Sequence, residues 1–393
     1  MRYVGTVSRG IRLPVVTKGD DIVKIITDNI IKAASSERDK FEIRDRDVIG
    51  VTESLVARSQ GNYVTLRDIS DDVARKFPEG DVAVISPILS RKRFHQLLRG
   101  MAAGIKGKIH VVLTYPSDEV GNQIIEPMNY YLNSGRLSGE CFSEDEYYKI
   151  FGEYKHPFTG VDYVQLYKSI DPERISVHFS NNPLSALKFA KQVIVASIHA
   201  RAIHRDILEK GGAEKVVTLD QICSSPVREG AGFNPDYGVL GSNYTNDDSV
   251  KLFPRGCEEF VRELQAEMKS RTGRDVEVLV YGDGAFKDPV CGIWELADPV
   301  VSPGFTDGLV GLPKEIKFKY VADNAEGKDP AKAVEEAIRA KSRLDRFGHS
   351  TLGTTPRRLT DLIGSLCDLT SGSGDKGTPV VYIQGYFDSY LDD

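Results

Sequence analysis

The sequence predicts an α+β fold with mixed sheets and an inserted α/β-like middle portion. An uninterrupted apolar run at 48–51 is typical of a strand that is covered on both faces. Residues 81–115 alternate as strand, helix and strand, the pattern of a crossover that packs on a parallel sheet. Residues 357–386 place leucines at helical spacing before a glycine-bearing loop and β-branched residues after it. Strands therefore occur towards both ends of the chain, with a separate strand–helix–strand unit between them.

The other elements follow from hydrophobic periodicity and from helix-breaking residues. Glycine, proline, asparagine and aspartate fill 224–250, which predicts one long loop. In chain order we expect a strand at 3–7, a helix at about 20–34, a long helix from 183 towards 209, a helix at 257–272, a strand at 276–280 and a charged helix at 330–345.

A chain of 393 residues exceeds a single ordinary core, so two or three domains are expected. The better boundaries lie near 75 and near 225. We therefore divide the chain into an N-terminal segment at 1–75, an enlarged middle α/β portion at 76–225 and a C-terminal segment at 226–393.

Composition and charge exclude several classes of protein. No apolar run approaches the roughly 20 residues that a membrane span requires, and the first residues lack the apolar block of a signal peptide. The five cysteines are scattered without a Cys-x-x-Cys pair, which favours reduced thiols in a cytoplasm. A net charge of −6 argues against a general nucleic-acid binder. We expect a cytoplasmic protein with neither a membrane nor a nucleic acid as partner.

Polar side chains follow both strands of the 81–115 unit. Ligands favour the carboxyl ends of parallel strands, so a small-molecule site in which the basic cluster binds an anion is one interpretation. A solvated helix start beside a polar loop is the other. The residues are Ser86, Ser90 and the basic cluster Arg91, Lys92 and Arg93 on one side, and Ser117, Asp118, Glu119 and Asn122 on the other.

The closing stretch "TSGSGDKGTPVVYIQGY" contains Gly-x-Gly-x-x-Gly at Gly372, Gly374 and Gly377. A dinucleotide-binding loop of this type needs a strand before the glycines and a helix after them. Here a helix precedes the loop and a strand follows it, so that assignment fails. A backbone nest for anions and a plain flexible turn both stay open.

Several ordered segments together resemble the coenzyme F-420-0:L-glutamate ligase (γ-glutamyl ligase) family. They are "RGIRLP", "DVIGVTESLVARSQG", "YGVLGSN", "TGRDVEVLVYGDG" and "DLIGSLCDLTSGSGDKGTPVVYIQG". The resemblance covers residues 1 to about 70 and about 231–387, with a much longer stretch between them than in typical members.

The resemblance implies an enzyme that uses GTP, or ATP, with manganese or magnesium to phosphorylate a substrate carboxylate. The amino group of glutamate then attacks the acyl phosphate. Such chemistry requires cations that neutralise the triphosphate and the positioning of two reactants away from water. The family also implies an intertwined homodimer and the γ-glutamyl ligase type of mixed sheet.

The resemblance assigns nucleotide contacts to four parts of the chain. Family members typically show Ser, Thr and Lys where this chain has Glu53, Ser54 and Arg58. Glu53 places an anion near phosphates, so it needs a metal or Arg58 as partner. The implied nucleotide-binding residues are Arg9, Gly10, Ile11, Glu53, Ser54, Arg58, Asn243, Ser371, Gly372, Ser373, Gly374 and Asp375.

The metal site is where the chain departs from the family. Leu240 stands where members carry a metal-binding Asp, and a leucine cannot bind a metal. Asp283 is the first choice as ligand, with Asp288 beside it, since hard cations prefer carboxylate oxygen. A turn aspartate is the alternative reading of Asp283. Other possible ligands are Asp236, Asp247 and Asp248.

Two functions of different classes follow. The first is a nucleotide- and metal-dependent amide ligase that joins glutamate, or a similar amino acid, to an acidic acceptor such as the deazaflavin or a folate-type pterin. The second is a noncatalytic nucleotide-binding or regulatory protein that has lost turnover through Leu240 and Glu53.

Overall fold

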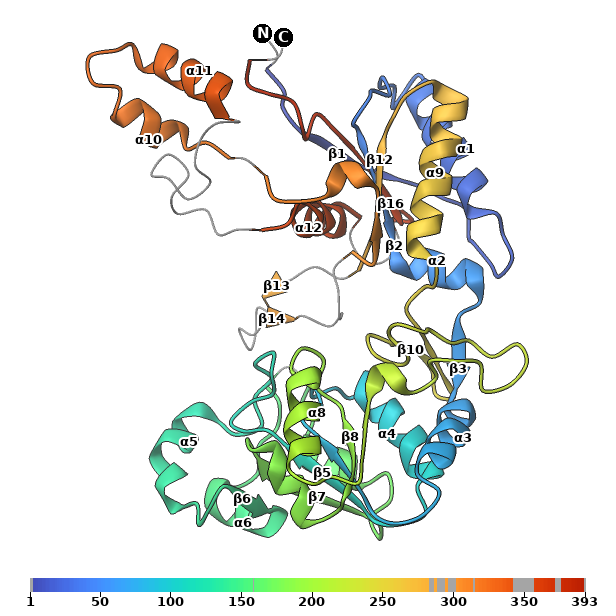
Figure 1. Ribbon diagram of the computed structural model, residues 1–393, viewed down its shortest axis with the longest axis vertical. Helices are drawn as coiled ribbons and strands as arrows, with labels where there is room; N and C mark the ends of the chain where they lie inside the picture. Colours follow the sequence, from blue (N-terminus) through green and yellow to red (C-terminus); the bar gives the residue numbers. More distant parts are fainter. Residues whose placement is uncertain are drawn as a thin grey trace.

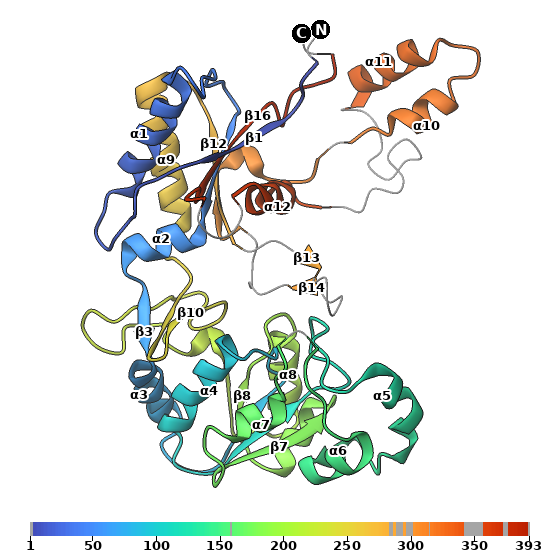
Figure 2. The same ribbon diagram turned by 180° about the vertical axis from the view of Figure 1, so that it is seen from behind.

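The computed structural model describes residues 3–157, 159–282, 286–287, 294–295, 302–313, 315–341, 357–371 and 376–391, with the backbone alone at 286–287 and 294–295. Figure 1 shows two lobes, each built around its own sheet, and Figure 2 shows the same division from behind. Helix α2 (Glu53–Gln60) and strand β3 (Tyr63–Thr65) lie where the chain passes between the lobes. The predicted α+β class with mixed sheets is confirmed.

The first lobe holds a five-stranded mixed sheet to which both ends of the chain contribute strands. β2 and β12 are parallel, and the other neighbouring pairs are antiparallel. Helices α1 and α9 cover one face and α12 covers the other, as both views show. The strands in sheet order are β1 (Val7–Ile11), β16 (Val380–Gln384), β2 (Val48–Thr52), β12 (Glu277–Tyr281) and β15 (Gly304–Phe305), and the helices are α1 (Ile22–Ser35), α9 (Cys257–Thr272) and α12 (Leu359–Ser371).

The apolar run at 48–51 forms the central strand β2, buried on both faces as predicted. Gly50 allows α12 to approach this strand closely. A Cβ at this position would overlap the Sγ of Cys367 and would lie 3.3 Å from Cδ1 of Tyr281. The absence of a side chain at Gly50 therefore sets how closely helix and sheet pack.

The second lobe holds a six-stranded sheet in the order β6-β7-β5-β4-β8-β9. From β4 the chain builds outward through β5 to β7 and then returns to the other side of β4 to form β8 and β9. All neighbouring pairs are parallel except β6 with β7. Such a reversal between β4 and β8 is the topological switch point of a doubly wound sheet. The strands are β4 (Val82–Ile85), β5 (Ile109–Leu113), β6 (Cys141–Ser143), β7 (Ile175–Ser180), β8 (Gln192–Val195) and β9 (Lys215–Thr218).

The strand–helix–strand reading of 81–115 is confirmed as β4, helix α4 (Arg93–Gly104) and β5. The long helix expected from 183 towards 209 is wrong. That stretch is a 3-10 helix (Pro183–Lys188), strand β8 and helix α8 (Arg201–Lys210). The residues Val193, Ile194 and Val195 are fully buried between β4 and β9, so pairing within the sheet overrides the helical periodicity of this stretch.

Two smaller expectations also need correction. The first strand runs over Val7–Ile11 instead of 3–7, because its register is set by antiparallel pairing with β16. The loop expected at 224–250 ends in a hairpin of β10 (Asn243–Asn246) and β11 (Ser249–Lys251), which pairs with β3. The remaining elements are α3 (Leu66–Lys76), α5 (Pro127–Asn133), α6 (Glu144–Phe151), α7 (Tyr163–Lys168), α10 (Phe318–Asp323), α11 (Pro330–Ala340), β13 (Phe286–Lys287) and β14 (Trp294–Glu295).

Among the described residues, no helix combines the length and the apolar character needed to cross a membrane. Cys141, Cys223, Cys257 and Cys367 are free thiols, and Cys291 lies outside the described residues.

Asp118 ties the loop after β4 to the loop after β5. Its carboxylate accepts hydrogen bonds from the backbone amides of Leu89 (2.8 Å), Val120 (3.0 Å) and Asn122 (2.8 Å), and from the Asn122 side chain (2.7 Å). Burial raises the pKa of this carboxyl to about 6, although the hydrogen bonds oppose the rise. The two loops are thus held together by a carboxyl that titrates near neutral pH.

We expect Asp118 to make the fold less stable as the pH rises from about 4 to about 6. In this range the folded state keeps a proton that the unfolded state has released, so the free energy of unfolding falls by roughly 2 to 3 kcal/mol in total. The Asp118→Asn variant lacks this titration. Urea denaturation should therefore show the stability difference between the two proteins moving in favour of the variant as pH rises. A difference that stays constant with pH would contradict the raised pKa.

Candidate functional site

One edge of the five-stranded sheet collects segments from distant parts of the sequence. Ile11 pairs with Val380, Val380 with Val51, and Val51 with Val280. Strands β1, β2 and β12 run in one direction and β16 runs in the other. The carboxyl ends of three strands and the amino end of the fourth therefore meet at this edge, which we call the ligase edge.

The closing loop begins and ends at the ligase edge. The Thr378 hydroxyl donates to the carbonyl of Ser371 (2.7 Å), and the amide of Leu13 donates to the carbonyl of Gly377 (3.1 Å). A Cβ on Gly10 would lie 2.9 Å from the side chain of Thr378. The structure thus brings together Gly10 and Ser371, two residues that the resemblance assigns to the nucleotide site. Between the two ends, Gly372, Ser373, Gly374 and Asp375 lie outside the described residues.

Helix α2 begins at the ligase edge with a cluster of four polar side chains, which we call the Glu53 cluster. The Lys251 ammonium donates to Ser54 Oγ (2.5 Å) and to Glu53 Oε1 (3.3 Å). The Asn243 amide also donates to Glu53 Oε1 (3.3 Å). Three residues predicted for the nucleotide site therefore lie together: Asn243 and Lys251 both contact Glu53, and Lys251 links Ser54 to this pair.

Lys251 is the functional candidate that sequence reasoning missed. Glu53 was expected to need a metal or Arg58 as partner, but its cationic partner is Lys251, and Nε of Arg58 donates to the carbonyl of Val16 (2.6 Å). Lys251 is 7% exposed and lies in the buried run Val250–Phe253. A lysine inside an apolar run is a signal of a buried, paired cation.

The neighbouring thiol of Cys257 does not supply a nucleophile. Burial, together with the nearby charge of Glu53, raises the pKa of this thiol to about 12. It therefore stays protonated at neutral pH, and the thiolate is the nucleophilic form of cysteine.

Arg9 and Ile11 lie on β1 but not in the Glu53 cluster. The Arg9 guanidinium donates to Oε1 of Gln384 (2.6 Å) and lies over the ring of Phe41, with 4.9 Å between its Cζ and the ring centroid. Gln384 also bonds to Asp47, which precedes β2, so Arg9 points towards the opposite end of the sheet. The side chain of Ile11 is buried in the core at the ligase edge.

The described residues do not form a metal centre by themselves. No group of three acidic, histidine or cysteine side chains suited to a metal occurs among them. Leu240 is fully buried in the core, as its apolar side chain requires. Asp236 is exposed, and Asp247 and Asp248 are exposed in the turn between β10 and β11. Asp283 and Asp288, the two predicted ligands, lie outside the described residues.

Comparison with known proteins gives one clear relationship. The family model described as F420-0:Gamma-glutamyl ligase matches residues 10–385. The match includes strands β2, β12 and β16 and the last two residues of β1, as well as the middle portion with the six-stranded sheet. A search of curated proteins finds no match. The extent of the family match, over nearly all of the sequence, shows that the chain belongs to the F420-0:γ-glutamyl ligase family.

Proposed function

We propose that the chain is a nucleotide-dependent amide ligase that joins L-glutamate, or a similar amino acid, to an acidic acceptor. Membership of the γ-glutamyl ligase family is the observation that carries the proposal. The convergence of Gly10, the Glu53 cluster and the ends of the closing loop at one sheet edge supports it.

The proposed reaction has two steps. The γ-phosphoryl group of GTP or ATP passes to a carboxylate oxygen of the acceptor, which leaves a nucleoside diphosphate and an acyl phosphate. The glutamate amine then attacks the acyl carbon, the bond to the phosphate oxygen breaks, and the nitrogen loses a proton. One triphosphate is consumed and one phosphate is released for each amide bond, so the protein has to position reactants and stabilise negative charge.

The Glu53 cluster is suited to the binding of an anion at the start of α2. The first amides of a helix and its positive dipole end favour phosphate oxygens. The Ser54 hydroxyl and the Lys251 ammonium lie at the same place, and Glu53 holds this ammonium in position. We propose that Lys251 and Ser54 contact the phosphates and that Glu53 and Asn243 act as positioning residues.

Exposed cations lie on other segments of the ligase edge. Arg12 and Lys376 are both exposed and lie on adjacent segments, since Leu13 bonds to Gly377. They would supply positive charge that the Lys251–Glu53 pair does not provide. Arg58, which is exposed on α2, would add to the same positive electrostatic potential.

The proposal includes Mn²⁺ or Mg²⁺, with Asp283 and Asp288 as ligands, because the resemblance implies a metal-dependent reaction. None of the roles given to Lys251, Ser54, Glu53 and Asn243 depends on the metal. A homodimer is proposed on the same ground, and light scattering of the purified protein would test it.

The test is an assay of purified protein with GTP or ATP, Mn²⁺ or Mg²⁺, glutamate, and either the deazaflavin or a folate-type pterin as acceptor. We expect phosphate release to match the amount of amide found by mass spectrometry, and both to stop when a chelator is added. The Asp283→Asn variant should lose about a hundredfold or more in turnover, whereas the exposed Asp236→Asn change should leave it unaltered.

Other outcomes of the assay would change the proposal. Unchanged turnover of the Asp283→Asn variant would remove this aspartate from the metal site. Nucleotide-dependent thermal stabilisation without turnover on any acceptor would favour the noncatalytic nucleotide-binding alternative. The burial of Leu240 where the family carries a metal-binding Asp is the observation that keeps this alternative in the test.

A further inference from the structure

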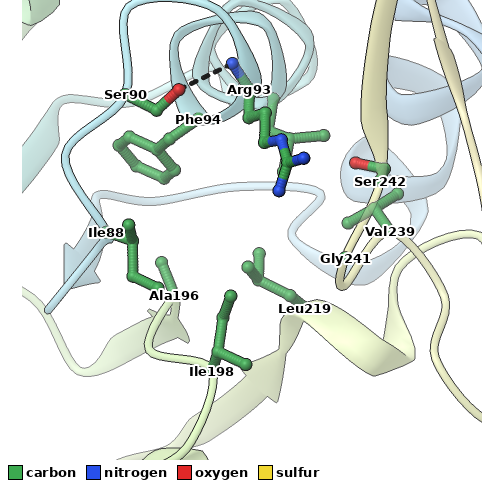
Figure 3. Close-up of a pocket in the computed structure, with 11 residues that line it drawn as sticks. Ile88, Ser90, Arg93, Phe94, Ala196, Ile198, Leu219, Val239, Gly241 and Ser242 are labelled. Atoms are coloured by element: carbon green, nitrogen blue, oxygen red, sulfur yellow. Dashed lines mark hydrogen bonds between the residues drawn. The ribbon is translucent and has the colours of Figure 1, made fainter. Parts of the chain in front are cut away.

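A cavity of about 80 Å³ lies in the second lobe, at the switch point between β4 and β8. This volume is several times the roughly 10–15 Å³ that one water requires. Apolar side chains from the ends of three parallel strands form most of its wall, as Figure 3 shows. They include Ile88 and Phe94 after β4, Ala196 and Ile198 after β8, and Leu219 after β9. In doubly wound sheets the switch point is where ligands bind.

The polar side chains of Arg93 and Ser242 face this cavity, and Ser90 also lines it. Figure 3 shows the Arg93 guanidinium and the Ser242 hydroxyl directed towards each other across it. Ser242 is only 4% exposed, and its Oγ has no hydrogen-bond partner among the described residues. A buried hydroxyl without a partner is uncommon in folded proteins and calls for an explanation, such as a bound molecule that supplies the missing hydrogen bond.

The start of α4 adds to the positive character around Arg93. Arg93 is the first residue of this 12-residue helix, and the Ser90 hydroxyl accepts from the amides of Lys92 (3.3 Å) and Arg93 (2.9 Å). Arg91 and Lys92 are exposed, and the Lys92 ammonium lies 5.2 Å from the centre of the Tyr244 ring. Of the basic cluster, Arg93 alone lines the cavity.

The backbone amides just before α8 form a second place at the switch point that could bind an anion, but a side chain of the protein occupies it. The carboxylate of Glu119 accepts from the amides of Ile198 (2.5 Å), His199 (3.2 Å) and Ala200 (3.2 Å), just before α8. The loop at 86–92 contains no glycine, so its backbone cannot approach a pyrophosphate as a dinucleotide-binding loop does. These features argue against a dinucleotide. Among the residues that line the cavity, the Arg93 guanidinium, the hydroxyls of Ser90 and Ser242 and an apolar wall are left, and the Ser90 hydroxyl already accepts from the amides at the start of α4.

We propose that this cavity binds a small monocarboxylate with an apolar body. The carboxylate would lie between the Arg93 guanidinium and the Ser242 hydroxyl, and the apolar body would pack against Ile88, Ile198 and Leu219. The site is separate from the ligase edge and does not depend on the proposed ligase reaction. Ser242, which lines the cavity, directly precedes Asn243 of the Glu53 cluster in the sequence.

Calorimetric titration of the full chain with 4-methylpentanoate tests the proposal, with the uncharged 4-methylpentanamide as a probe of the same shape. The acid should bind and the amide should bind at least about tenfold more weakly, because a charge-assisted pair is lost. Arg93→Gln should weaken binding of the acid by about tenfold or more. The matched control, Arg91→Gln, removes the same charge from the exposed neighbour and should leave the affinity unchanged.

Ser242→Ala provides a variant that is expected to fold. It removes a hydroxyl without a partner, so its unfolding midpoint should equal or exceed that of the wild type, while its affinity for the acid falls several-fold. Equal affinity for acid and amide, unchanged binding in Ser242→Ala, equal effects of Arg93→Gln and Arg91→Gln, or no binding of the acid at about 10 mM would each overturn the proposal.

Discussion

Replacing Lys251 with methionine should lower the free energy of unfolding by about 3 to 5 kcal/mol, the range seen when one partner of a buried ion pair is removed. Lys251 is 7% exposed and Glu53 is 5% exposed. Methionine keeps most of the apolar length of the side chain, so the change removes the charge with little loss of packing. The Glu53 carboxylate then lies buried without its cation, and chemical denaturation followed by circular dichroism measures the cost.

An exposed ion pair provides the matched control. The Lys24 ammonium lies 2.6 Å from the Asp28 carboxylate, closer than Lys251 lies to Glu53, but the Lys24 side chain is 64% exposed. Lys24→Met should therefore cost less than about 1 kcal/mol. If Lys251→Met costs no more than Lys24→Met, burial does not strengthen the Lys251–Glu53 interaction as we infer.

The double variant Glu53→Gln/Lys251→Met separates stability from function. Removing both charges leaves no buried carboxylate without its counter-charge, so most of the lost stability should return. Nucleotide affinity should stay low in the double variant, because the ammonium that we propose to contact phosphates is still missing. Recovery of both properties would show that Lys251 acts only as the partner of Glu53.

Local patterns in the sequence correctly predicted helices with one apolar face and strands made of apolar residues. The helix expected at 257–272 is α9, and the strand expected at 276–280 is β12 at Glu277–Tyr281. The helix predicted from 183 towards 209 is wrong, because a four-residue strand at Gln192–Val195 is too short for its hydrophobic periodicity to distinguish it from a helix. Its place in the sheet is decided by β4 and β9, which lie far away in the sequence.

The candidate site was likewise predicted only in part. Family resemblance pointed to Glu53, Ser54 and Asn243, and the fold places these three side chains together. Lys251 was missed because its partner Glu53 is 198 positions away, and no local pattern links them. The hairpin of β10 and β11 brings them together only after it pairs with β3. Long-range strand pairing therefore completes a site that the sequence predicts only in part.

Gly50→Ala is expected to destabilise the protein by about 3 kcal/mol, at the upper end of the usual cost of overpacking a core. The added methyl group would overlap the Sγ of Cys367 and contact Tyr281 at 3.3 Å, so α12 has to move away from β2. Since α12 ends at Ser371, where the closing loop begins, the same displacement should also weaken nucleotide binding. Urea denaturation and nucleotide titration measure the two effects.

Cys367→Ala tests whether this overlap is the cause. Without Sγ, the nearest atom of residue 367 to the new methyl group is its Cβ, at 3.2 Å, a contact that small shifts can relieve. The double variant Gly50→Ala/Cys367→Ala should therefore be more stable than Gly50→Ala by about 1 to 2 kcal/mol. Cys367→Ala alone should be destabilising, because it removes buried volume. Gly139→Ala, where an added Cβ meets no atom within 4 Å, should change stability by less than about 0.5 kcal/mol. If the effects of Gly50→Ala and Cys367→Ala simply add, contact between α12 and β2 through Gly50 does not account for the loss.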